Sequence, residues 1–496
     1  MTVKEIAHKE PQSLVGRAYA FAQHAHAGQK RKTGEPFFNH PLTTAETLRH
    51  WHLDDASVAA GLLHDVVEDT PVTREEIVKH FGDEVAFLVD GVTKLSHIKY
   101  RGNEVRLSEA AAREAQIENL RKMIIALSED LRVVFVKLAD RLHNMKTLGA
   151  LPPQKQKRIA AETNEIYAPI AYRLGMQSVS GELRDLAFPY LHPEEYRRLT
   201  SLAKTPYESR LKYLERLKPK VEMALATQSI KPITIDFRAK RYSSLYHKLK
   251  RYEMNIEKIY DLVAMRIIVH DITECYGALG AIHQAWPPLP GRIKDYIAMP
   301  KPNGYRSLHT TVIGPENTFV EIQIRTEVMH NENEHGIAAH WLYDQKKVSG
   351  HAPKTVKQLT EEVKWVQQLK SWQEKYRGDD VQSDEFLESM KVDFFKDRIF
   401  CITPRGDIVI LPSGATPVDF AYNIHSQVGD ACIGAKVNDR IVPLEYELQS
   451  GELVEILTQK NKRPSEDWLL FVKTSLARDH IRTALRAKRK IFEPKR

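Results

Sequence analysis

The chain has 496 residues, a length that predicts several domains rather than one core. Its 73 Lys and Arg outnumber its 65 Asp and Glu, and the net charge of +8 favours phosphate-rich partners such as nucleotides or RNA, although a surface adjusted only for solubility would look the same. Its 3 cysteines show no C-x-x-C spacing, which argues against a zinc site or a disulfide framework and favours a reducing compartment.

The chain begins with polar and charged residues. Residues 1–11 lack the apolar core of a signal peptide, and the sequence contains no run of about 18 apolar residues. We therefore expect a cytoplasmic protein without a membrane span.

The first part of the chain has a helical pattern. Apolar residues recur at helical spacing up to about Leu191, as at Val58, Leu62 and Val66, so residues 1–195 are predicted to form an all-α domain. Beyond Ile230 the pattern changes, because residues 262–269 form a continuous apolar run typical of a buried strand.

A second strand is predicted at Phe319 to Arg325, where apolar and polar residues alternate strictly. Its polar face carries Glu321, Gln323 and Arg325. Residues 196–345 are therefore predicted to form a mixed α/β domain. Residues 346–390 are expected to be a helical linker, residues 391–460 a small domain of short strands with a turn at 403–407, and residues 461–496 a basic helical segment.

The first chemical motif is His64-Asp65-Val66-Val67-Glu68-Asp69. On a helix its four ionisable residues share one face, because each residue advances by about 100°. An exposed helix with a solvated acidic face is the alternative, but the apolar residues 59–63 argue against it. With His40 and Asp140 added, two histidines and two aspartates suit Mn²⁺ or a similar divalent ion, which leaves Glu68 and Asp69 for acid/base work.

This arrangement resembles the HD superfamily, and the flanking sequence is similar to the hydrolase domain of RelA/SpoT homologues. The similarity lies in residues 31–36, 91–95 and 140–145. It implies removal of the 3′-pyrophosphate from ppGpp and pppGpp at a Mn²⁺ site. It also implies metal ligation by His40, His64, Asp65 and Asp140, catalysis by Glu68 and Asp69, and a nucleotide pocket lined by Arg31, Lys32, Asn144 and Thr147.

The second motif is a loop at residues 290–307 that combines cations with two tyrosines. Such a loop suits a nucleotide, because phosphates pair with Lys and Arg and a base stacks on Tyr, although a merely solvated basic loop is the alternative. The loop is not a P-loop. Asp261 and Glu321, both at predicted strand positions, are carboxylates able to hold Mg²⁺ on a triphosphate.

This second region resembles the RelA/SpoT synthetase domain, over residues 238–240, 260–262, 291–309, 321–325 and 334–341. The resemblance implies a nucleotidyltransferase-like fold that transfers pyrophosphate from ATP to the 3′-hydroxyl of GDP or GTP. It implies Asp261 as the Mg²⁺ ligand and Glu321 as a second acid, either ligand or base. Tyr305 would stack on guanine with Gln323 and His309 close by, and the phosphates or adenine would be held by Arg238, Lys240, Arg292, Lys294 and Lys301.

The third region, residues 393–458, resembles a TGS domain, a small β-grasp module, most clearly at residues 421–425. In longer relatives this domain meets uncharged tRNA on the ribosome, which implies an RNA contact by His425. A packed or capping histidine is the alternative interpretation.

Together these features predict a multidomain α+β chain with an all-α hydrolase domain, a mixed α/β synthetase domain and a TGS domain, acting as a bifunctional alarmone enzyme of the stringent response. The alternatives are a hydrolase with a regulatory synthetase-like domain, a ribosome- or tRNA-binding regulator with vestigial sites, and a generic HD nucleotidase. Because opposed activities on one chain would waste ATP, we hypothesise reciprocal control through the helical region between Pro152 and Lys218.

Overall fold

The computed structural model describes residues 1–96, 122–123, 125–127, 129–259, 261–301, 303–336, 338, 398–460 and 462–492. The chain divides into two compact units, Met1–Lys375 and Tyr376–Arg496. The predicted linker at 346–390 lies outside the described residues. Within the described ranges, no helix is both long and apolar enough to cross a membrane.

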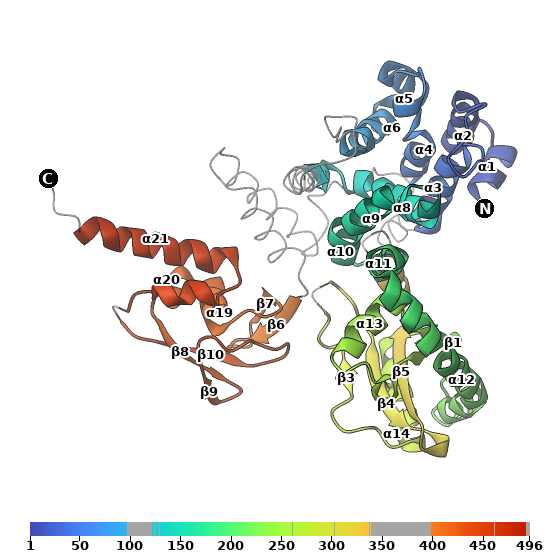
Figure 1. Cartoon of the computed structure of the whole chain (residues 1–496). Helices are drawn as coiled ribbons and strands as arrows, with labels where there is room; N and C mark the ends of the chain where they lie inside the picture. Colours follow the sequence, from blue (N-terminus) through green and yellow to red (C-terminus); the bar gives the residue numbers. More distant parts are fainter. Residues whose placement is uncertain are drawn as a thin grey trace. The chain divides into compact units, whose positions relative to one another are not determined.

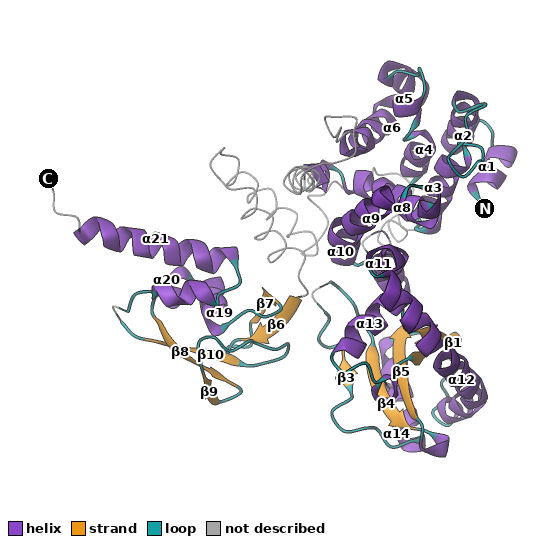
Figure 2. Cartoon of the chain, in the orientation of Figure 1, coloured by secondary structure: helices purple, strands orange, loops and turns teal. Residues whose placement is uncertain are grey.

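The first part of unit 1 is built from helices, as the sequence predicts (Figures 1 and 2). Its elements are α1 (Val3–Lys9), α2 (Leu14–Ala25), α3 (Asn39–His50), α4 (Asp55–Leu63), α5 (Val66–Asp69), α6 (Arg74–Ser96), α8 (Leu131–Lys146), α9 (Pro153–Glu162), the π-helix η2 (Thr163–Tyr167), α10 (Ala168–Arg173) and α11 (Gln177–Leu191).

Three of these helices form the centre of the helical part. Helix α4 is buried along Ala56–Leu63 and begins at Asp54, whose side chain accepts a hydrogen bond from the backbone of Ser57. Helix α8 is buried from Val133 to Asp140, and α3 packs against both α4 and α8. The start of α3, the end of α4 and the middle of α8 are thereby held together.

The second part of unit 1 is a five-stranded mixed sheet with helices packed against it. Its elements are α12 (Pro193–Ala226), β1 (Thr234–Ala239), α13 (Tyr242–Lys250), β2 (Val263–Val269), α14 (Ile272–Ala285), β3 (Lys294–Asp295), β4 (Leu308–Ile313), β5 (Phe319–Thr326) and α15 (Glu327–His335). The strand order is β1-β2-β5-β4-β3, and only β2 and β5 are parallel.

The two strands predicted from the sequence are confirmed. All of β2 is buried except the partly buried Arg266, and the apolar side chains of β5 enter the core below the sheet. The other face of β5 is also covered, since Gln323 is 9% exposed and Arg325 is 0% exposed. The alternation of apolar and polar residues on β5 therefore does not distinguish a buried face from a solvent-exposed face, because both faces are buried.

The helical part and the sheet part of unit 1 meet along α11 and α15. Gly336, which follows α15 with φ of 59°, lies against the backbone of Leu174 and Gly175, so closely that a Cβ would collide with it. Beside this contact His335 meets the rings of His50 and His52, with centroids 5.5 and 5.6 Å away.

The histidine contact predicts a pH-dependent stability. Burial, and then the neighbouring His50 and His52, lower the pKa of His335 to about 4. Since the unfolded histidine has a pKa of about 6.5, between about pH 6.5 and 4 this histidine is protonated in the unfolded chain and neutral in the folded chain. The stability of the fold therefore falls as pH drops from about 6.5 to about 4. Urea unfolding across this range should show a weaker pH dependence in His335→Gln than in the parent chain, and equal slopes would contradict the prediction.

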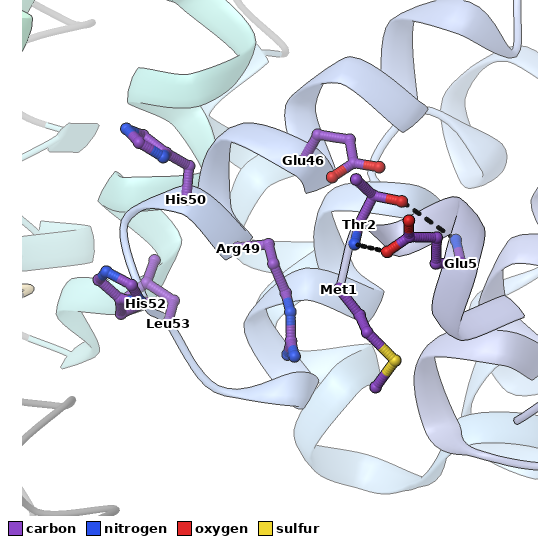
Figure 3. A pocket seen from close by; sticks show the side chains of 8 residues that line it. All are labelled: Met1, Thr2, Glu5, Glu46, Arg49, His50, His52 and Leu53. Atoms are coloured by element: carbon purple, nitrogen blue, oxygen red, sulfur yellow. Dashed lines mark hydrogen bonds between the residues drawn. The ribbon is translucent and has the colours of Figure 1, made fainter. Parts of the chain in front are cut away.

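His50 and His52 also border a pocket of about 540 Å³ near the N-terminus (Figure 3). The other lining residues are Met1, Thr2, Glu5, Glu46, Arg49 and Leu53. None of the residues predicted to carry chemistry lines this pocket, so its size alone does not make it a catalytic site.

Unit 2 contains two small sheets and packed helices. Its elements are β6 (Arg398–Ile402), β7 (Ile408–Pro412), α19 (Pro417–Ile424), α20 (Ser426–Asp430), β8 (Cys432–Val437), β9 (Arg440–Val442), β10 (Val454–Thr458) and α21 (Ser475–Phe492). The predicted hairpin is β6–β7, the other sheet has the order β10-β8-β9, and a parallel bridge between Ile402 and Leu453 joins them. Buried Asp419 accepts hydrogen bonds from Thr416, Lys473 and Thr474, which ties α19 to the segment before α21.

Candidate functional sites

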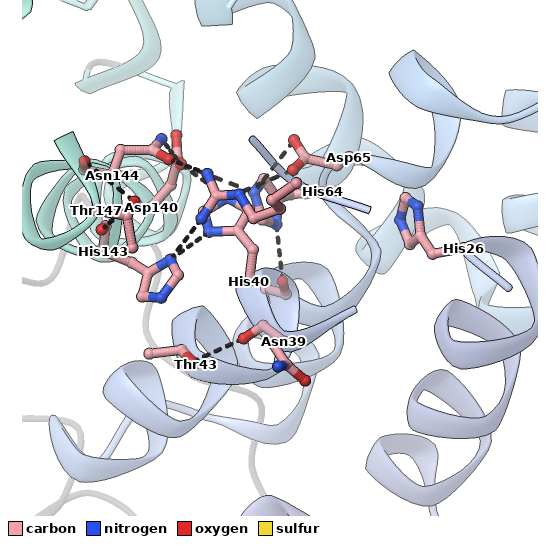
Figure 4. Close-up of polar contacts among 12 residues, drawn as sticks. His26, Asn39, His40, Thr43, His64, Asp65, Asp140, His143, Asn144 and Thr147 are labelled. Atoms are coloured by element: carbon pink, nitrogen blue, oxygen red, sulfur yellow. Dashed lines mark hydrogen bonds and ion pairs between the residues drawn. The ribbon is translucent and has the colours of Figure 1, made fainter. Parts of the chain in front are cut away.

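Two histidines and two aspartates converge inside the helical part of unit 1 (Figure 4). His40 Nε2 lies 3.4 Å from Asp65 and 3.2 Å from Asp140, and His64 Nε2 lies 3.2 Å from Asp65 and 4.0 Å from Asp140. Ligand atoms about 2.1 Å from one ion lie about 3.0 Å apart at right angles and about 4.2 Å apart when opposite. These spacings fit a divalent metal ion.

Both histidines direct Nε2 toward the two aspartates. His64 donates from Nδ1 to the carbonyl oxygen of Gly61 at 2.8 Å, and its buried Nε2 has no hydrogen-bond partner among the described residues. Burial lowers the pKa of His40, which favours the neutral imidazole that metals bind.

His143 fixes the tautomer of His40. Arg31 can only donate, so the Nδ1 of His143 that it contacts at 3.1 Å is an acceptor. His40 Nδ1 lies 2.7 Å from the same nitrogen and must therefore be the donor, which leaves His40 Nε2 for a metal. Burial, and then the charges of His40 and Arg31, lower the pKa of His143 to about 4, so this ring stays neutral.

His143 was not predicted from the sequence as a site residue. It lies one turn after Asp140 on α8, within the motif quoted for the family resemblance, but it touches the metal centre only through His40. The spacing of metal ligands in the sequence does not reveal a residue that only hydrogen-bonds to one of those ligands.

We expect His143→Ala to weaken Mn²⁺ binding by about 10- to 100-fold, because a ligand without its outer hydrogen bond loses its orientation. Mn²⁺ titration followed by electron paramagnetic resonance measures this directly. The matched control is His24→Ala, which removes an exposed histidine of α2. Equal Mn²⁺ affinity in all three chains would contradict the assignment.

Asp140 is held from two sides. Its Oδ2 pairs with the buried ammonium of Lys137 at 2.7 Å, and its Oδ1 accepts from Asn144 while facing His40. Asn144 also accepts from Arg31 at 2.7 Å. Burial alone would raise the pKa of Asp140, but Lys137 and His40 hold that pKa well below its usual value.

The expectation of one continuous helix through residues 64–69 is wrong. Helix α4 ends at Leu63 and α5 begins at Val66, because Asp65 has a ψ of −8° that breaks the helical hydrogen bonding. The break leaves His64 and Asp65 between the two helices and places Glu68 and Asp69 on the short α5. Burial and the charge of Asp65 raise the pKa of Asp69.

The remaining predicted residues of this site lie at its edge. Arg31 reaches the centre through His143 and Asn144, whereas Lys32 is exposed. Thr147 caps the end of α8, and its hydroxyl donates to the carbonyl oxygen of His143 at 3.2 Å.

The sheet part of unit 1 contains a pocket of about 270 Å³. Its lining includes five of the predicted synthetase residues and several residues of α11. The lining residues are Tyr172, Gln177, Ser180, Gly181, Arg184, Arg238, Ala239, Lys240, Arg241, Ser244, Asp261, Ala264, Glu321 and Gln323.

Asp261 precedes β2 and lies between two ammonium groups. It pairs with Lys240 and, at 2.7 Å, with Lys248 of α13. Burial alone would raise the pKa of Asp261, but the two lysines lower it, so the carboxylate is charged. Lys248 was not predicted as a site residue, since nothing in the local sequence distinguishes it from the other cations of α13.

Glu321 on β5 is contacted by two predicted neighbours. Gln323 donates to Glu321 Oε1 at 3.0 Å, and His309 Nδ1 lies 3.4 Å from the same oxygen. His309 Nε2 lies 2.7 Å from the hydroxyl of Tyr305, which is 4% exposed. The strand register brings them together, because His309 on β4 is opposite Gln323 on β5.

The other predicted cations are more peripheral. Lys301 lies over the rings of Tyr296 and Tyr305, 4.7 and 4.9 Å from their centroids. Arg292 and Lys294 are exposed and do not line the pocket.

His425 in unit 2 links α19 to α20. Its Nδ1 accepts a hydrogen bond from the backbone of Gln427 at 3.2 Å, so it caps α20, and its side chain is exposed. Capping therefore accounts for Nδ1 of His425, and its Nε2 belongs to an exposed side chain.

The chain is similar to known proteins along most of its length. Family models match residues 18–177 (HD domain), 237–348 (region found in RelA / SpoT proteins) and 399–458 (TGS domain). It is 47% identical over 476 residues to a GTP pyrophosphokinase of Myxococcus xanthus, covering 96% of this chain and 61% of that protein.

Two further relatives carry the name of the opposite reaction. A probable guanosine-3′,5′-bis(diphosphate) 3′-pyrophosphohydrolase of Synechocystis is 46% identical over 472 residues, covering 95% of this chain and 60% of that protein. A guanosine-3′,5′-bis(diphosphate) 3′-pyrophosphohydrolase of Aquifex aeolicus is 46% identical over 473 residues, covering 95% and 64%. The chain thus spans about three fifths of the length of the curated relatives it matches.

Proposed function

Since this chain belongs to the RelA/SpoT family, we propose that it both makes and degrades guanosine 3′-pyrophosphates. In synthesis it would transfer pyrophosphate from ATP to GDP or GTP, and in hydrolysis it would return ppGpp or pppGpp to GDP or GTP plus pyrophosphate. The observation that carries the proposal is the presence on one chain of two separate polar centres, one around His40 and His64 and the other around Asp261 and Glu321.

For hydrolysis, His40, His64, Asp65 and Asp140 would hold a divalent ion, which we propose to be Mn²⁺. When bound, such an ion lowers the pKa of water and polarises a phosphoryl oxygen. Asp69 has a raised pKa and would supply a proton to the leaving group, with Glu68 orienting the water. Arg31, Lys32, Asn144 and Thr147 would bind the nucleotide.

For synthesis, Glu321 would accept the proton of the guanosine 3′-hydroxyl as its oxygen attacks the β-phosphorus of ATP, and AMP would leave. Asp261 would hold Mg²⁺ in place of one of its lysine contacts. The lysine so released, together with Arg238, would face the phosphates of ATP. Tyr305, Gln323 and His309 would border the guanine, with Arg292, Lys294 and Lys301 as outer phosphate contacts.

For unit 2, we propose contact with uncharged tRNA on the ribosome through the TGS domain. The exposed His425, whose Nε2–H is directed away from its capping bond, is the candidate contact. The 3 cysteines are buried free thiols, which suits a cytoplasmic location.

A pair of assays tests the proposal. The chain is incubated with ATP, GDP and Mg²⁺, and separately with ppGpp and Mn²⁺, and AMP and pyrophosphate are followed. We expect both products. Pyrophosphate without AMP would favour a hydrolase with a regulatory synthetase-like domain, and neither product would favour an RNA-binding regulator.

A further inference from the structure

We infer that Arg325 is a positioning residue for synthesis, which orients Glu321 and His309 through two hydrogen-bonded chains. The inference rests on the proposed synthetase function. Arg325 is on β5, four residues after Glu321, and its side chain is on the same face of the sheet.

The burial of Arg325 is the first observation. Its side chain is 0% exposed, and its Nε and Nη1 have no hydrogen-bond partner among the described residues. This burial also lowers the pKa of its guanidinium. An apolar side chain would fill this position without the free-energy cost of desolvating a charge. The arginine therefore needs an explanation other than packing.

The first chain runs through Tyr305 and His309. Arg325 Nη2 donates to the hydroxyl of Tyr305 at 3.1 Å, so the tyrosine hydrogen must go elsewhere. Its acceptor is His309 Nε2 at 2.7 Å. Burial lowers the pKa of His309, and the neutral ring with an unprotonated Nε2 carries its hydrogen on Nδ1, which faces Glu321 Oε1.

The second chain runs through Gln323. Arg325 Nη2 also donates to Gln323 Oε1 at 2.9 Å, which fixes the orientation of the amide. The amide nitrogen then donates to Glu321 Oε1 at 3.0 Å. Both chains end on the same oxygen of Glu321, and this leaves Oε2 to receive the proton of the 3′-hydroxyl.

The direction of both chains depends on Arg325. Because a guanidinium has no acceptor, it sets the polarity of every hydrogen bond that follows. Without it, Tyr305 can turn its hydroxyl, His309 can exchange tautomers and Gln323 can flip. Lysine keeps a donor but lacks the planar fork, so it should restore only part of the effect.

The experiment compares Arg325→Met and Arg325→Lys in the full chain. We expect Arg325→Met to lower kcat for AMP formation by about 100-fold, with KM for ATP nearly unchanged and Arg325→Lys intermediate. Hydrolysis of ppGpp should keep its rate in both variants. The matched control is Arg266→Lys, a half-buried arginine of β2 that pairs with Asp236 and Glu334 and does not contact Glu321.

A readout independent of activity is the tautomer of His309. Side-chain nitrogen chemical shifts, assigned by the signal lost in His309→Gln, should change in Arg325→Met and in Tyr305→Phe but stay constant in Arg266→Lys. Tyr305→Phe serves the test if Arg325→Met does not fold. Unchanged His309 shifts, or an equal loss of kcat in Arg325→Lys and Arg266→Lys, would overturn the inference. A parent chain that forms no AMP but shows the predicted shifts would instead overturn the proposed function.

Discussion

Replacing Glu321 by Gln is expected to abolish AMP formation from ATP and GDP while leaving ppGpp hydrolysis intact. Glutamine keeps the size of the side chain and an oxygen for Gln323 and His309, so the pocket retains its shape. It cannot accept the 3′-hydroxyl proton, and the loss of a general base lowers rates by about 10²- to 10⁴-fold. Both products are measured on one preparation, so hydrolysis reports that the chain is folded.

The control for this change is Glu316→Gln, which neutralises a glutamate that is 67% exposed and has no contact with the pocket. It should retain both activities. AMP formation by Glu321→Gln at the parental rate would show that the proton goes elsewhere.

The second large effect is expected from Asp140→Asn. The change removes an anion from the proposed metal centre and should lower hydrolysis at least 100-fold, with synthesis maintained. It also leaves the charge of Lys137 buried beside a neutral amide, and breaking such a pair costs about 3 kcal/mol. Hydrolysis and thermal unfolding should therefore both respond.

A double variant separates these two effects. Lys137→Met combined with Asp140→Asn removes both buried charges, so most of the lost stability should return while hydrolysis stays absent. If hydrolysis returned together with stability, Asp140 would be a structural partner of Lys137 and not a ligand.

The sequence predicted the elements whose pattern is local. The buried run of β2 and the alternation of β5 are properties of successive residues, and both strands are confirmed. The pairing of β4 with β5 is not local, and it alone brings His309 opposite Gln323. For the same reason spacing could not reveal the contacts of Arg325, since Tyr305, which accepts its hydrogen bond, is 20 residues away in the sequence.

The proposed metal centre shows the same limit. His40, His64, Asp65 and Asp140 were recognisable because ligand types and family motifs coincide, but the break between α4 and α5 at Asp65 was not predicted. His143 depends on a tautomer, which is decided by the hydrogen bond from Arg31 and by burial. Neither burial nor hydrogen-bond direction can be read from residue spacing.

Helix α11 gives the two centres a common boundary. Gln177, Ser180, Gly181 and Arg184 line the pocket beside Asp261, and the same helix packs against α8, which carries Asp140. A nucleotide that displaced α11 would also act on α8, so the hypothesis of reciprocal control has a physical path.

Thermodynamic linkage then allows only one coupling constant for the pair of sites. If the proposed function holds, the factor by which ATP changes the affinity of the proposed hydrolase centre for ppGpp must equal the factor by which ppGpp changes the affinity for ATP. Calorimetric titrations should therefore give the same coupling factor whether ATP or ppGpp is added first. Under the proposed function, this single helix would transmit the effect of a ligand in either site to the other.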